Sequence, residues 1–126
     1  IGLGIPAEPL FRSRDLDGKE VRFRTSAALP RLYRQQFGSD VFIDLNNLRN
    51  TVKKNKTSGL PADTLSTVEN LAYCMAKHAD DSVPDKIEDW LAQFSTTAVY
   101  MAAQTIMEMW NEEQAMLSKP KNQPSR

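Results

Sequence analysis

The stretch that decides the fold runs from Pro61 to Phe94 and reads PADTLSTVENLAYCMAKHADDSVPDKIEDWLAQF. Its first part carries apolar residues at steps of three and four, the spacing of one face of an α-helix. The second part repeats this spacing after an acidic corner, where Pro84 suits the first turn of a new helix. Two amphipathic helices are therefore predicted. Seven of their side chains are expected to form the frame of the core: Leu65, Val68, Ala72, Met75, Trp90, Leu91 and Phe94.

The composition is typical of one soluble globular domain, with 126 residues, of which 40% are hydrophobic and 25% charged. The sequence contains no apolar run of the length that a bilayer requires, so we expect no transmembrane helix and no membrane partner. Cys74 is the single cysteine, which excludes an internal disulfide bond and fits a protein of the cytoplasm.

The two halves of the sequence carry opposite charge, although the net charge is zero. Residues 10–56 hold eleven Lys or Arg against five Asp or Glu, whereas residues 57–117 hold two against ten. Such halves attract each other, within one molecule or between neighbouring copies, and salt weakens the attraction.

Residues 10–25 predict a β-hairpin with its turn at residues 15–18. The Asp17-Gly18 pair supplies the positive-φ residues that a tight hairpin turn requires. Val21 and Phe23 alternate with charged residues, so we expect these two side chains to face inward. Because two strands alone are marginally stable, the inner face must pack against a helix or another chain.

Two helices are predicted next, at residues 27–37 and 41–54. Thr25-Ser26 can cap the first and Gly38 ends it, while Ser39 or Asp40 can cap the second. Residues 55–59 are polar and contain no large apolar side chain, so they are predicted to form the flexible loop of the domain.

A final helix is predicted from Ala98 to Met116, and its apolar residues cover more than one stripe. One face, which includes Val99, Ala102, Ala103 and Ile106, suits the core. The remaining methionine and aromatic side chains are of the kind that contact varied protein partners. An ordinary core role is the alternative. The residues expected to bind a partner or a second copy are Tyr100, Met101, Met107, Met109 and Trp110.

Cys74 and His78 lie four residues apart on one predicted helix, close enough to share a metal, with Asp80 or Asp81 as a further oxygen ligand. Structural zinc normally takes four protein ligands and catalytic zinc three, and the chain contains no other Cys or His. The lone histidine also argues against a nucleophile and base pair. We therefore predict no enzyme activity, no catalytic residue, no cofactor and no metal.

A cluster of basic residues near position 50 could follow a nucleic-acid backbone: Arg49, Lys53, Lys54 and Lys56. Cations are also favourable at the C-terminal end of a helix, and the chain as a whole is neutral rather than basic. Nucleic-acid binding is thus the weaker interpretation of this cluster.

Three segments together resemble the tail assembly chaperones of long-tailed phages and prophages of Gram-positive bacteria. They are GKEVRFRTSAALPRLYRQQFGSDVF from Gly18, LSTVENLAYCMAKHADDSVPDKIEDWLAQF from Leu65, and IMEMWNEEQ from Ile106. The resemblance covers about residues 18–114 and rests on the order of these segments, with no catalytic signature among them.

The resemblance implies a small, mainly α-helical protein of the host bacterial cytoplasm that acts during tail morphogenesis and is absent from the mature virion. Members of the family coat the tape-measure protein and keep it soluble, and a longer frameshifted form recruits tail-tube subunits. Self-association into a homo-oligomer is also implied. Two alternatives stay open, a structural tail-completion or connector protein and a small nucleic-acid-binding regulator.

The predicted architecture is a mainly α fold, a compact bundle of about five helices preceded by a short N-terminal β-hairpin. Residues 10–117 are expected to form one helical chaperone domain. Residues 1–9 are predicted to be a disordered or non-native lead, and residues 118–126 a disordered tail, because the tail is too poor in apolar groups to offset its ordering entropy.

Overall fold

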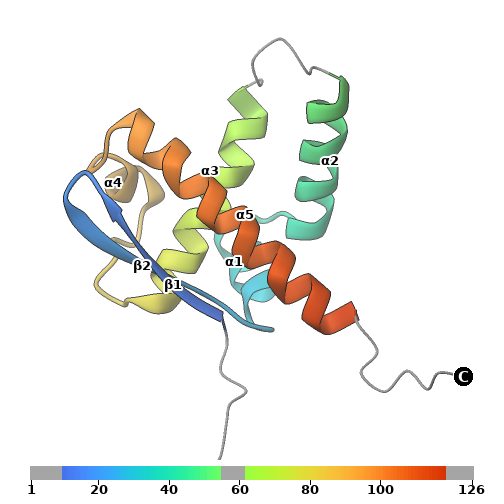
Figure 1. The fold of residues 1–126 in the computed structure, drawn as a ribbon, viewed down its shortest axis with the longest axis horizontal. Coiled ribbons are helices and arrows are strands. Elements are labelled where there is room, and N and C mark those ends of the chain that lie inside the picture. Colours follow the sequence, from blue (N-terminus) through green and yellow to red (C-terminus); the bar gives the residue numbers. More distant parts are fainter. Residues whose placement is uncertain (1–9, 55–61, 119–126) are drawn as a thin grey trace, which may run out of the picture.

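A computed structural model describes residues 10–54 and 62–118 of the chain, and it has a mainly α-helical fold (Figure 1). A two-stranded antiparallel hairpin comes first and five helices follow, as predicted. The predicted lead at 1–9, the predicted loop at 55–59 and residues 119–126 of the predicted tail lie outside the described residues. Ser118, the first residue of that predicted tail, is the last residue of the final helix.

The hairpin consists of β1 (Leu10–Leu16) and β2 (Lys19–Thr25), with Leu16 paired to Lys19. Asp17 and Gly18 form the turn with φ angles of 55° and 83°, so both adopt the left-handed region, as predicted. The turn is shorter than expected, because Leu16 belongs to β1. Its side chain is buried in the core, together with that of Phe23.

Helix α1 (Leu29–Phe37) begins two residues later than predicted, and the predicted cap at Thr25-Ser26 was wrong: the N-cap is Ala28, which has no side-chain cap. The hydroxyl of Ser26 instead accepts the N–H of Ala28 before the helix starts. Gly38 ends α1 in the left-handed conformation, with φ of 70°, and its N–H donates to the carbonyl of Arg34. Helix α2 (Val41–Lys54) has the predicted bounds. Asp40 caps it by accepting the N–H groups of Phe42 and Ile43.

The opening stretch forms α3 (Ala62–Ala79) and α4 (Ile87–Leu91), and α5 (Thr96–Ser118) follows. The prediction for α4 was wrong in two respects. Pro84 lies before the N-cap Lys86 rather than in the first turn, and Phe94 lies beyond the end of α4. The helix is short because the connection from α3 occupies residues 80–86, a longer segment than the sequence pattern indicated.

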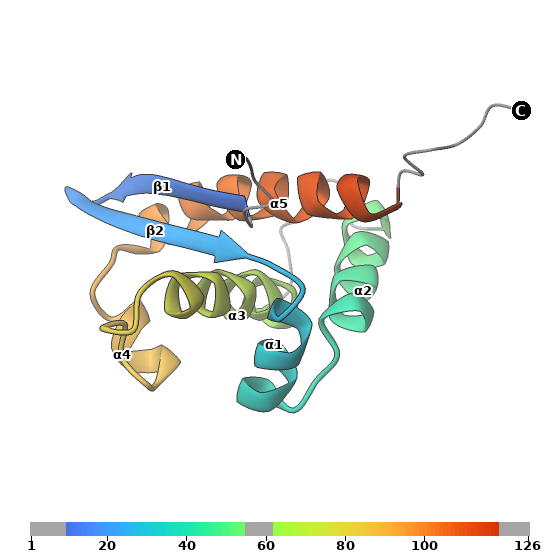
Figure 2. The same cartoon turned by 90° about the horizontal axis from the view of Figure 1, so that it is seen from below.

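Helix α3 lies in the middle of the molecule (Figures 1 and 2). Strand β2 packs mainly against α3 and strand β1 mainly against α5, whereas α1 and α4 lie on the other side of α3 (Figure 2). The ring of Tyr73 on α3 meets those of Phe37 and Trp90 edge to face, at centroid distances of 6.3 and 5.8 Å. Among the described helices, none is long and apolar enough to cross a membrane.

Polar contacts fix the hairpin along helix α5. Each joins residues that lie far apart in the sequence, at distances of 2.7 to 2.8 Å. They are Arg12 with Glu112, Arg14 with Thr105, and Thr25 with Glu113. At the other end, the carboxylate of Asp17 accepts the N–H and the hydroxyl of Ser95, directly before α5. The hairpin therefore spans α5 from its start to its last turns.

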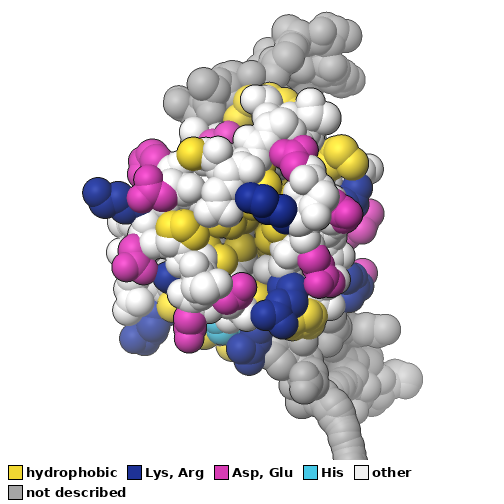
Figure 3. All heavy atoms as spheres, turned by 90° about the vertical axis from the view of Figure 1, so that its left-hand side faces the viewer, with side chains coloured by type: hydrophobic (Ala, Val, Ile, Leu, Met, Phe, Trp, Pro, Cys, Tyr) yellow, Lys and Arg dark blue, Asp and Glu magenta, His cyan; other side chains and the backbone are white. Residues whose placement is uncertain are grey.

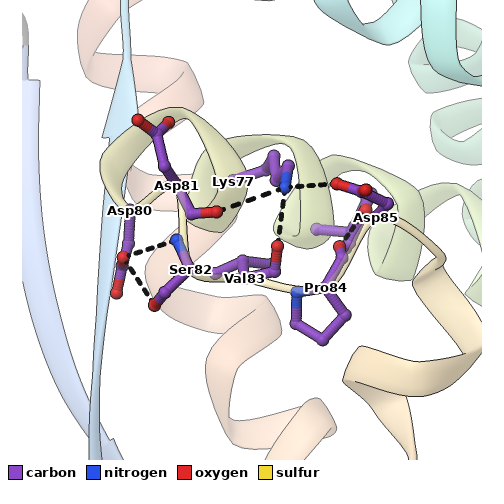
Figure 4. A network of polar contacts seen from close by, with 8 residues as sticks. Lys77, Asp80, Asp81, Ser82, Val83, Pro84 and Asp85 are labelled. Atoms are coloured by element: carbon purple, nitrogen blue, oxygen red, sulfur yellow. Dashed lines mark hydrogen bonds and ion pairs between the residues drawn. The ribbon is translucent and has the colours of Figure 1, made fainter.

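The ammonium group of Lys77 holds the connection between α3 and α4 (Figure 4). It donates to the carbonyl of Val83 at 2.6 Å and to the carboxylate of Asp85 at 2.8 Å. Beside it, the carboxylate of Asp80 accepts both the N–H and the hydroxyl of Ser82, which closes a local turn. These contacts position α4 although it has only one and a half turns of its own.

Candidate protein-binding groove

An apolar groove with a volume of about 230 Å³ lies between α3, α4 and the start of α5, and it is open to solvent. Its apolar walls come from three places in the sequence that the fold brings together. The lining residues are Leu65, Val68, Glu69, Leu91, Phe94, Ser95, Thr96, Val99, Tyr100 and Ala103.

The groove exists because burial decreases along α3 toward its N-terminal end. Ala72 and Met75 are buried, whereas Leu65 and Val68, on the same stripe, are only half-buried. The stripe thus continues past the part of the helix that the domain covers. The segment of this apolar face that carries Leu65 and Val68 therefore remains accessible to solvent.

The end of α4 and the residues after it supply another wall. The ring of Trp90 is buried and meets that of Phe94 edge to face at 5.3 Å, which holds Phe94 in place. The ammonium of Lys19, from the hairpin, lies 5.8 Å from the centroid of the Phe94 ring. Phe94 is therefore fixed from two sides while it lines the groove.

Seen from the side of the molecule that carries α4 and the hairpin turn, hydrophobic side chains gather in the hollow middle of the face (Figure 3). Lys, Arg, Asp and Glu side chains surround them (Figure 3). An apolar centre within a polar rim is the arrangement of many protein-binding sites.

Among the described residues that line the groove, Glu69 is the one that carries a charge. Burial raises the pKa of its carboxyl group above the ordinary value of 4.5, because the surroundings disfavour the charged form. Within the described part of the chain, no hydrogen bond or ion pair to this carboxylate is present, in contrast to Asp85 or Glu112, which pair with Lys77 and Arg12.

The predicted partner-binding residues of α5 divide into three groups by exposure. Tyr100 and Met101 are 50% and 45% exposed, and Tyr100 lines the groove. Met107 is half-buried against the core. Met109 and Trp110 are only 0% and 2% exposed, so the expectation that they face a partner is corrected: in this fold they belong to the core.

The seven predicted frame residues also divide. Ala72, Met75 and Trp90 are buried, as expected. The other four, Leu65, Val68, Leu91 and Phe94, pack less completely and line the groove. The sequence did not single out Glu69, and it assigned Val99 and Ala103 to the core face. Their helical spacing was visible, but the incomplete cover over this end of α3 was not.

Cys74 and His78 line one hollow between α1 and α3, but their environments differ. The Cys74 thiol is buried, and burial raises its pKa to about 12, which keeps it protonated and unreactive. His78 Nε2 lies 2.9 Å from the hydroxyl of Ser26, and burial together with nearby Arg24 lowers the pKa of the imidazole. Among the residues that the structure describes, no group of three or more His, Cys, Asp or Glu side chains could hold a metal ion.

Among the residues that the structure describes, the exposed ion pair of Arg12 and Glu112 joins the basic half to the acidic half. In the basic cluster, Arg49 is exposed on α2. The side chains of Lys53, Lys54 and Lys56 lie outside the described residues.

The chain matches no protein-family model, and neither a curated relative nor a similar solved structure was found.

Proposed function

We propose that this chain is a phage tail assembly chaperone that binds the tape-measure protein and keeps it soluble during tail morphogenesis. The three segments from Gly18, Leu65 and Ile106, which resemble that family, support the proposal. It places the protein in the host bacterial cytoplasm and outside the mature virion, acting by binding rather than by catalysis.

The observation that carries the proposal is the apolar groove between α3, α4 and α5. Half-buried Val68 and Phe94 and half-exposed Tyr100 are held by the fold in an accessible hollow. Covering such side chains stabilises a complex by about 25 cal/mol for each Å² of apolar surface removed from water. A chaperone for a long, aggregation-prone protein needs a surface of this kind.

The proposal includes two further partners. Copies of the chain associate with each other, and the half-exposed side chain of Met101 on α5, which does not line the groove, is available for this contact. Tail-tube subunits are recruited by a longer frameshifted form that shares this domain.

Coexpression with the tape-measure protein of the same phage tests the proposal. We expect the tape-measure protein to become soluble and to co-purify with the chain, and we expect the chain to be absent from purified virions. A matched expression of the tape-measure protein with an unrelated small helical protein controls for general effects. If the tape-measure protein neither co-purifies with the chain nor gains solubility, the proposal fails. Detection of the chain in virions would favour a structural tail protein.

A further inference from the structure

We propose that the groove binds one amphipathic helix of the partner, and that this helix carries a Lys or Arg whose side chain pairs with Glu69. The inference rests on the proposed function, since the partner is taken to be the tape-measure protein. It adds which surface binds, which secondary structure the bound segment adopts, and which charge it must carry.

The lining residues favour a helix as the occupant. Those on α5 recur at helical spacing, Thr96, Val99, Tyr100 and Ala103, and they face Leu65 and Val68 on α3. Two helices with exposed rows of side chains form ridges and a slot into which the side chains of a third helix can pack.

An extended strand or a small molecule fits less well. Strand addition requires a free sheet edge, and no residue of β1 or β2 lines the groove. Small-molecule pockets commonly have volumes of about 300–1,000 Å³. The groove has about 230 Å³, enough for a few side chains that project from a helix.

Glu69 sets the charge of the occupant. Its carboxylate is already partly removed from water and has no partner among the described residues. A bound apolar helix would remove more water, and an ion buried without a counter-ion is costly. A Lys or Arg on the bound helix removes this cost, so the groove selects against helices that are neutral or acidic at this position.

A second copy of the chain is the less suitable occupant. Among the described residues, three large apolar ones outside α5 are exposed. Phe11 lies on strand β1 with the guanidinium of Arg22 at 6.0 Å from its ring centroid, so it offers no helix to the groove.

Phe42 and Ile43 lie together at the start of α2. They are flanked by Asp40 and Asp44. Docking this segment would bring carboxylates toward Glu69, and like charges at an interface repel each other.

The test compares variants in coexpression with the tape-measure protein. Glu69→Lys reverses the charge in the groove, and Glu108→Lys makes the same change at an exposed position of α5 outside it. We expect Glu69→Lys to reduce the co-purified amount at least tenfold and Glu108→Lys to leave it within about twofold. Urea unfolding checks that both variants are folded.

A synthetic peptide then tests the pairing directly. The probe is the tape-measure segment that hydrogen exchange shows to be protected in the complex, with each Lys or Arg replaced in turn by Glu. One replacement should weaken binding to the wild-type chain about tenfold or more and restore binding to Glu69→Lys, as measured by fluorescence anisotropy.

The outcomes separate the two proposals. If the wild-type chain does not bind the tape-measure protein, the proposed function fails. If the wild-type chain binds and Glu69→Lys binds equally well, or if no charge reversal in the peptide restores binding, the groove inference is overturned while the function stands.

Discussion

At the scale of single residues, position around the axis of α5 decides between core and surface. Ala102, Ile106, Met109 and Trp110 fall on one side of the helix and are buried, whereas Met101 falls on the other. The helical spacing placed Ala102 and Ile106 on the core face, but it did not place Met109 there, since methionine and aromatic residues occur nearly all round this helix. The indole of Trp110 also meets the ring of Phe42 at 5.4 Å, a contact between distant segments that no local pattern contains.

Trp110→Ala is expected to lower the free energy of unfolding by about 3–5 kcal/mol, because it leaves a cavity beneath α5. Met101→Ala, at a position that is 45% exposed, should change it by no more than about 0.5 kcal/mol. Urea unfolding followed by circular dichroism measures both. A Trp110→Ala protein of unchanged stability would mean that the indole lies at the surface after all.

The burial of His78 makes the stability depend on pH. The folded-state pKa lies below the ordinary value of 6.5, so the unfolded chain binds the proton first as the pH falls. This contribution to stability is fully present above about pH 6.5 and is lost as the pH falls from there toward the lower folded-state pKa. One group can change the free energy of unfolding by at most about 1.4 kcal/mol per pH unit.

The measurement is urea unfolding at pH 7.5 and pH 5.5 for the wild type and for His78→Gln. The wild type should lose more stability between the two values than the variant does. An equal loss in both proteins would show that carboxylates or other groups account for the pH dependence.

At the scale of elements, several turns and helix ends that depend on neighbouring residues were predictable. The length of the short helix α4 was not. Asp17-Gly18, Gly38 and Asp40 act as the sequence indicates, because positive φ and capping depend on near neighbours. Helix α4 depends instead on α3. Lys77 binds the backbone before it, and the Tyr73 hydroxyl donates to the carbonyl of Pro84. Such contacts follow only from the tertiary fold, so the length of α4 was overestimated.

Gly38→Ala is expected to destabilise the protein by about 1–2 kcal/mol, because a Cβ disfavours the left-handed conformation that ends α1. Nothing lies within 4 Å of the added Cβ, so the cost is conformational rather than steric. Gly38→Asn should cost less, since asparagine tolerates this conformation. Thermal unfolding of the three proteins gives the order, and an alanine variant as stable as the wild type would contradict the argument.

At the scale of the whole molecule, the sequence indicated the fold class and the acidic and basic halves, and it indicated only part of the groove. Tyr100 was assigned to a binding surface for its side-chain type, and Val68 and Phe94 to the core for their spacing. The groove depends on how far the neighbouring elements cover α3, which is a property of the assembled domain. The role proposed for the Glu69 carboxylate depends on the assembled groove in the same way.

Self-association is testable at the same scale. We expect the protein to sediment as an oligomer and Met101→Glu to shift it toward the monomer, since a charge on this half-exposed side chain disfavours an apolar contact. Urea unfolding of the variant should match that of the wild type. Oligomers that persist unchanged would place the contact elsewhere on the surface.

The hydrogen bonds and the ion pair between the hairpin and α5 also affect folding during translation. Arg12 and Glu112 are 100 positions apart, so the first strand leaves the ribosome long before its partner helix has been translated. Helix α3 can cover β2 earlier, but until α5 is made β1 lacks the helix that it mainly packs against. The packing of the hairpin can therefore be completed only after α5 has been translated. A chain that stalls before α5 would leave β1 without this helix and would be more prone to aggregate.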